Sequence, residues 1–105
     1  MYEYYKRLKK INEDFVENRE KYFLIIKEIV KKYEGKAYLF GSFLKGSAIA
    51  ASDIDILIEI PNNVYWADVL NDLKSKINNP KFEFHVYNKE EAEIIKKLIK
   101  NYKEI

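Results

Sequence analysis

The amino-acid sequence predicts an α+β fold, in which a small mixed β-sheet is flanked by helices and preceded by an N-terminal helical extension. Apolar residues recur at helical spacing over residues 2–33. Apolar runs typical of strands follow at 36–40, 53–60 and 81–87, and helical stripes follow the second and third of them. The 105 residues contain no stretch rich in Pro, Gly or Ser, so we expect one domain over 1–105.

The first helical segment is unusually long for a small domain. Residues 2–33 form either one helix or two helices with a break between Val16 and Tyr22, and Gly35 suits a C-terminal stop. We predict that 1–18 is an extension that forms a protein interface and that 19–105 is the core that carries the site. The reason is an apolar and aromatic stripe on this helix, which a chain this short has little core to bury. The stripe consists of Tyr2, Tyr5, Leu8, Ile11 and Phe15.

The later elements follow from local signals. The strand over 36–40 leads into a Gly-Ser turn, and the strand over 53–60 ends at Pro61, which cannot donate to a ladder. Asn62 or Asn63 is expected to cap a helix over 64–77 with the apolar stripe Trp66, Val69, Leu70, Leu73 and Ile77. After the strand over 81–87, Asn88 and Glu91 predict a capping box for a last helix with Ala92, Ile95, Leu98, Ile99 and Tyr102 facing inward.

The segment from Gly41 to Asp55 holds the most informative spacing in the chain. Gly41 and Ser42 are followed, after ten residues, by Asp53 and Asp55. In a strand, residues i and i+2 point to the same face about 6.5–7 Å apart, so the two carboxylates would lie on one side and repel each other unless cations neutralise them. Mg²⁺ prefers such oxygen ligands together with substrate phosphates. Two Mg²⁺ ions would suit an in-line phosphoryl displacement.

The residues around the Gly-Ser pair suit a phosphate group. Gly41 has no Cβ, so the backbone can turn sharply and approach a ligand. Ser42 is expected to cap a short helix whose first N–H groups attract anions. Lys45 either adds a cation for the phosphate or is a solvated loop lysine, and Ser52 either contacts phosphate or simply begins the next strand. The pattern is not a P-loop, because Lys45-Gly46-Ser47 stands in the wrong order.

These residues resemble the signature of the minimal nucleotidyltransferases of the DNA polymerase β superfamily, which is Gly-Ser, ten residues, then Asp-x-Asp. The match is Gly41, Ser42, Asp53 and Asp55, and the resemblance extends over about residues 25–99. It implies transfer of a nucleoside monophosphate from a nucleoside triphosphate, with ATP as the expected donor, to an acceptor hydroxyl with release of pyrophosphate. It also implies Asp53 and Asp55 as ligands of two Mg²⁺ ions.

The same family carries a third carboxylate on a later strand, where it holds one metal and takes the proton of the acceptor. The candidate is Glu83, which alternation places on one strand face with His85 and Tyr87. A glutamate departs from the commoner aspartate and is one methylene longer. His85 is left open between orienting a carboxylate and a structural role.

The resemblance also suggests a partner. Small stand-alone members look like antitoxins encoded beside a HEPN-type ribonuclease, which they bind and silence by adenylylation, so we expect a HEPN-type protein partner or a homo-oligomer. The net charge of only +2 disfavours a long nucleic acid as acceptor. The absence of cysteine and of an apolar run of about 20 residues predicts a cytoplasmic protein outside the membrane.

Two alternatives stay open. The first is a binding module of the same fold, a neutralising subunit whose site is vestigial. The second is an aminoglycoside-type nucleotidyltransferase, which is less favoured because such enzymes bring an additional domain for their acceptor.

Overall fold

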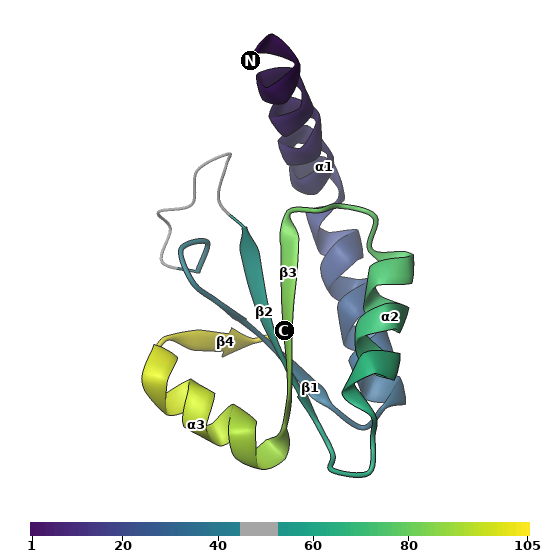
Figure 1. Ribbon diagram of the computed structural model, residues 1–105, viewed down its shortest axis with the longest axis vertical. Coiled ribbons are helices and arrows are strands. Elements are labelled where there is room, and N and C mark those ends of the chain that lie inside the picture. Colours follow the sequence, from purple (N-terminus) through teal and green to yellow (C-terminus); the bar gives the residue numbers. More distant parts are fainter. Residues whose placement is uncertain (45–52) are drawn as a thin grey trace.

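The computed structural model describes residues 1–44 and 53–105, and it confirms the α+β fold (Figure 1). The helices are α1 (Tyr2–Lys32), α2 (Trp66–Lys76) and α3 (Lys89–Ile99). The strands are β1 (Lys36–Phe40), β2 (Ile54–Ile60), β3 (Phe82–Asn88) and β4 (Tyr102–Glu104). None of these helices is both long and apolar enough to span a membrane within the described part of the chain.

The sheet is mixed and has β2 near its centre. Its strand order is β3-β2-β1-β4, with β2 parallel to β3 and β1 antiparallel to β2 and to β4. β2 is buried along almost its whole length, on both faces. The registers align Phe40 with Asp55 and Asp55 with Glu83.

Helices cover the sheet unequally. α1 and α2 pack on the face that carries the alternate β2 residues Ile54, Ile56, Ile58 and Ile60, and they form the main core there (Figure 1). α3 lies against the opposite face, where the Nζ of Lys96 is 3.0 Å from Glu59 and 4.0 Å from the centre of the Tyr38 ring. This buried ion pair fastens α3 to the sheet.

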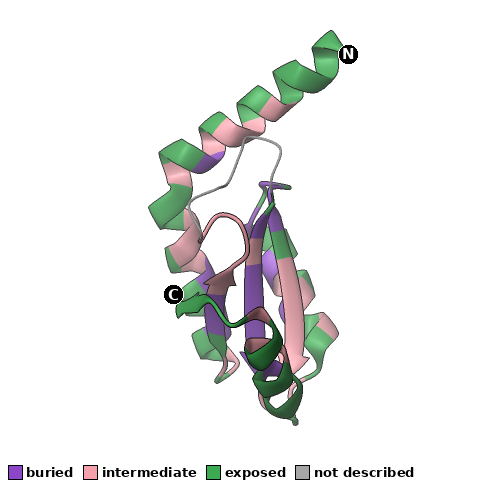
Figure 2. Ribbon diagram, turned by 90° about the vertical axis from the view of Figure 1, so that its left-hand side faces the viewer, coloured by how far each residue is buried: buried purple, intermediate pink, exposed green. Residues whose placement is uncertain are grey.

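α1 is one continuous helix of 31 residues, so the alternative of two helices is not realised. Its buried residues start at Phe15, and the turns before it extend past the sheet (Figure 2). Tyr2, Tyr4 and Tyr5 are 75%, 58% and 60% exposed. Phe15, the last residue of the stripe expected at this interface, is instead buried in the core at 3% exposure. The interface predicted at 1–18 stays a prediction for the exposed aromatic residues before it.

The expected Asn cap of α2 is wrong. The helix begins at Trp66 after Tyr65, and no side chain caps it. The N–H of Val64 donates to the carbonyl oxygen of Pro61 at 3.1 Å, so Asn62 and Asn63 are the central residues of a turn. Trp66 was expected in the buried stripe but is 53% exposed.

The capping box of α3 is confirmed, whereas its predicted end is wrong. The N–H of Glu91 donates to the Asn88 side chain at 2.8 Å, and the N–H of Asn88 donates to the Glu91 carboxylate at 3.1 Å. The chain then leaves the helix at Lys100, whose φ is 63°. Tyr102 consequently lies in β4 opposite Phe40, and Leu98, expected to face inward, is 71% exposed.

A polar cluster ties α1 to the loop before β3. The Asn79 side chain, only 5% exposed, donates to the carbonyl oxygen of Ile11 at 2.9 Å and to the Asp14 carboxylate at 2.8 Å. It also accepts the N–H of Lys81 at 2.8 Å. The Asn79 side chain thus hydrogen-bonds both to residues of α1 and to the backbone just before β3.

The hydroxyl of Tyr22 donates to the same Asp14 carboxylate. This hydrogen bond, followed by that from Asn79, lowers the pKa of Asp14. Burial and the Asp14 carboxylate together raise the pKa of Tyr22 to about 12. The cluster is therefore built around a charged Asp14 and a neutral Tyr22.

We expect Asn79→Ala to lower the free energy of unfolding by about 2–3 kcal/mol, because it removes three hydrogen bonds and leaves the buried N–H of Lys81 without its acceptor. Urea denaturation measures the change. The matched control is Asn78→Ala, since Asn78 is the exposed neighbour; equal losses in the two variants would contradict this assignment.

The lowered pKa of Asp14 predicts a stability that depends on pH. A carboxyl group with a depressed pKa in the folded state stabilises the fold above its unfolded pKa, and this contribution disappears as the pH falls through the folded pKa. We expect wild type to exceed Asp14→Asn in unfolding free energy at about pH 7 and to exceed it less at about pH 3. The same difference in unfolding free energy at both pH values would contradict this prediction. Asp68→Asn, on the exposed side of α2, is the control.

Candidate active site

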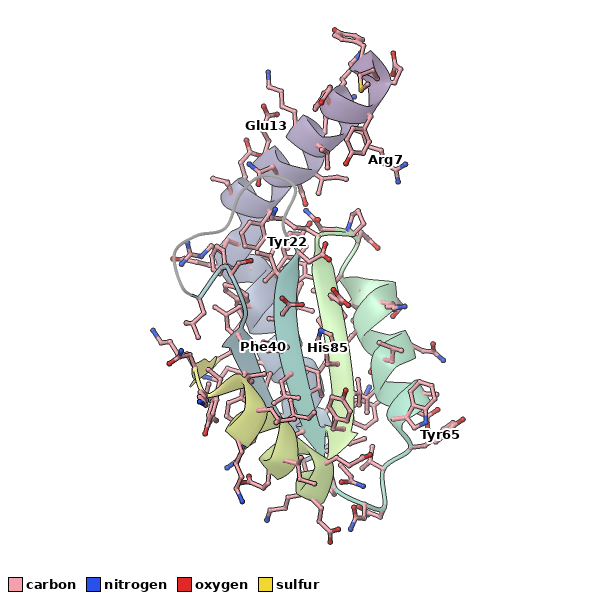
Figure 3. The ribbon with its side chains drawn as sticks, turned by 60° about the vertical axis from the view of Figure 1, so that its left-hand side comes forward. Arg7, Glu13, Tyr22, Phe40, Tyr65 and His85 are labelled. Atoms are coloured by element: carbon pink, nitrogen blue, oxygen red, sulfur yellow. The ribbon has the colours of Figure 1, made fainter. Side chains whose placement is uncertain are left out.

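The candidate site lies where β1 ends and where β2 and β3 begin. Pairing of the strands places Phe40, Asp55 and Glu83 side by side across three strands. Alternation along β3 brings His85 to the same face as Glu83. Figure 3 shows Phe40 and His85 on this face, and the centres of their rings are 5.3 Å apart.

Asp55, Glu83 and His85 form a compact cluster. One ligand atom from each lies within 4.8 Å of the others. The Nε2 of His85 is 3.2 Å from Oδ1 of Asp55 and 3.9 Å from Oε1 of Glu83. The Asp55 side chain is 24% exposed and that of Glu83 is 53% exposed, so a ligand can reach the cluster from solvent.

Asp53 lies at the edge of this cluster. It immediately precedes β2 and is exposed. A side-chain hydrogen bond with Asp53 is the main cause that raises the pKa of Glu83; burial adds to it, and the charge of His85 opposes it. The hydrogen bond from one carboxyl group to another requires a proton, so Glu83 holds its proton more readily than a lone glutamate does.

The donor set fits a divalent cation. Two carboxylates on neighbouring strands offer the hard oxygen atoms that Mg²⁺ and Mn²⁺ prefer. A cation there would also relieve the repulsion that otherwise favours protonation of Glu83. The imidazole of His85 adds a nitrogen donor at the same place. The sequence analysis left the role of His85 open, although a position two residues after Glu83 on a strand indicates the same face.

Gly41 closes the site on the β1 side. Its φ is +83°, in the left-handed region, and a Cβ built there would lie 2.5 Å from Oδ2 of Asp55. A side chain at this position would therefore displace the Asp55 carboxylate. Ser42 follows directly and begins a turn over residues 42–44; the helix that it was expected to cap would extend into residues outside the described part of the chain.

The structure brings together four of the residues predicted from sequence: Gly41 with Asp55, and Glu83 with Asp53 and Asp55. Ser42 follows at the next position. Lys45 and Ser52, the other predicted phosphate contacts, lie outside the described residues, as do Gly46 and Ser47. The roles assigned to all these residues stay predictions.

Comparisons with known proteins point to one family. A family model described as a nucleotidyltransferase domain matches residues 19–105. The chain is similar to a crystal structure of a candidate nucleotidyltransferase at 31% identity, over 76% of this chain and 92% of that one, with a TM-score of 0.61. It shares the fold of a second candidate nucleotidyltransferase, from Sulfolobus solfataricus, at 22% identity over 85% and 83% of the two chains, with a TM-score of 0.53. No curated protein matched.

We expect Gly41→Ala to abolish most Mn²⁺ binding, because the new Cβ would push the Asp55 carboxylate out of the cluster. The strained φ should also cost about 1–3 kcal/mol of stability. Calorimetric Mn²⁺ titration of folded protein measures the first effect, and thermal unfolding measures the second.

The control is Gly35→Ala at the other end of β1, where a Cβ would meet the carbonyl oxygen of Glu59. This variant should lose stability and keep its Mn²⁺ affinity. Wild-type Mn²⁺ affinity in Gly41→Ala would refute the close contact between this glycine and Asp55.

Proposed function

Because this chain belongs to the nucleotidyltransferase domain family, we propose that it transfers a nucleoside monophosphate from a nucleoside triphosphate to an acceptor hydroxyl. The observation that carries the proposal is the convergence of Asp55 and Glu83, which adjacent strands place side by side, with Asp53 in hydrogen-bond contact. Carboxylates gathered at one accessible place are the arrangement that metal-assisted phosphoryl transfer needs.

Asp53, Asp55 and Glu83 would hold the metal, which we propose to be two Mg²⁺ ions. When bound, the ions supply charge neutralisation of the phosphates and of the developing negative charge. His85 is proposed to orient Asp55 through its hydrogen bond to Oδ1. This orientation leaves the carboxylate fixed between the imidazole and Gly41.

The chemical step forms one P–O bond and breaks another. The acceptor hydroxyl oxygen attacks the α-phosphorus, the bond from that phosphorus to the β-phosphate oxygen breaks, and pyrophosphate leaves. Glu83 is proposed to take the proton of the hydroxyl as general base. Gly41 and Ser42, with Lys45 and Ser52, are proposed to hold the triphosphate.

We propose ATP as the donor and a protein as the acceptor, namely a HEPN-type toxin that this chain neutralises as an antitoxin. The support is the N-terminal part of α1, which extends past the sheet (Figure 2) and carries the exposed Tyr2, Tyr4 and Tyr5. Exposed aromatic side chains of this kind are enriched at protein interfaces.

A neutralising subunit without catalysis is the second candidate. The close approach of His85 to Asp55, together with the hydrogen bond between Asp53 and Glu83, favours it, because each of these carboxylates already has a partner within the protein. In that case binding to the partner alone would neutralise it.

The first experiment is calorimetric titration of ATP, GTP, CTP and UTP with Mg²⁺ into wild type and into Asp53→Asn/Asp55→Asn. We expect Mg²⁺-dependent binding, tightest for ATP, that weakens at least about tenfold in the double variant because metal ligands are lost. Asp68→Asn/Glu90→Gln, which neutralises two exposed carboxylates on α2 and α3, is the matched control. Nucleotide binding that survives the double substitution, or no binding by wild type, would favour the second candidate.

A further inference from the structure

The aromatic ring of Phe43 joins α1 to the turn that follows β1. Phe43 comes directly after Ser42. Its ring centre is 5.5 Å from that of Phe15, in an edge-on contact, and the Cζ of Arg19 lies over the ring at 5.2 Å. Phe15 and Arg19 are one helical turn apart. Arg19 is therefore held at the Gly-Ser turn, although it is distant from it in sequence.

The guanidinium of Arg19 has no carboxylate partner among the described residues. Some cations elsewhere in the fold do have carboxylate partners: Lys32 lies 2.8 Å from Asp72, and Lys96 lies 3.0 Å from Glu59. A ring face attracts the guanidinium through its π-electrons and uses none of its N–H groups as conventional hydrogen-bond donors. Arg19 is thus charged, exposed and able to donate hydrogen bonds to an anionic ligand.

The negative charge of the candidate site favours an additional protein cation such as Arg19. Asp53, Asp55 and Glu83 are three carboxylates, and a nucleoside triphosphate adds further negative charge. Two divalent cations neutralise only part of this total. Protein cations that contact the phosphates complete the neutralisation in phosphoryl-transfer sites, and arginine does so with two parallel hydrogen bonds to a phosphate.

We propose that Arg19 binds the β- and γ-phosphates of the nucleoside triphosphate, with Phe43 serving as the platform that positions its guanidinium. The inference rests on the proposed function and adds α1 to the nucleotide site. A surface arginine that only stacks on a ring would give the same contact with Phe43 but would not affect the affinity for phosphate groups.

The test compares Arg19→Met, which keeps an unbranched side chain over the Phe43 ring, with Arg19→Lys, which keeps the charge. We expect Arg19→Met to weaken Mg²⁺-ATP binding at least about tenfold, as charge-assisted hydrogen bonds are lost, while AMP binding changes less than about twofold. Arg19→Lys should recover part of the ATP affinity. Lys27→Met, an exposed cation on the same helix, should bind like wild type.

Three results would overturn the assignment: ATP affinity in Arg19→Met equal to wild type, an equal loss for ATP and AMP, or an equal loss in Arg19→Met and Lys27→Met. Thermal unfolding of each variant checks that the turn is still supported. Failure of the proposed function is separate and visible in the wild type, which would then bind no Mg²⁺-nucleotide at all; in that case the Arg19 proposal falls with it.

Discussion

The pairing of β2 with both of its neighbours is the constraint on which the site depends. Asp55 is set opposite Phe40 on one side and opposite Glu83 on the other. A shift of one residue in either register would send the carboxylates to opposite faces of the sheet. The buried isoleucines on the other face of β2 resist such a shift, because it would carry Ile54, Ile56 and Ile58 out of the core. The apolar core thus fixes the geometry of a polar site.

α1 supports the site from the other side of the sheet. Phe15 contacts Phe43 after β1 and Phe82 at the start of β3, with ring centres 5.5 Å apart in each case. Asn79 anchors the loop before β3 to the same part of the helix. One stretch of α1 therefore holds the two chain segments that carry the Gly-Ser turn and Glu83. These contacts do not join the two segments to each other. Each segment contacts α1, and the helix thereby sets their relative positions.

Sequence reasoning succeeded where the signal was local. β1 and the capping box of α3 depend on adjacent residues, and the structure confirms both. It failed where distant pairing decides: Tyr102 has a helical spacing from Leu98, but it pairs with Phe40, some sixty positions earlier. The same limit applies to the site. The sequence indicated Asp53, Asp55 and Glu83, whereas the hydrogen bond from His85 to Asp55 depends on the stagger of two parallel strands, which no local pattern reports.

The continuity of α1 has a consequence for binding. A helix of 31 residues measures about 46 Å at 1.5 Å per residue, which is close to the longest dimension of the whole molecule, 45 Å. Its exposed N-terminal end and its sheet-packed end belong to one continuous helix. A molecule bound to the exposed tyrosines would therefore contact the same helix whose Phe15 packs against Phe43 and Phe82.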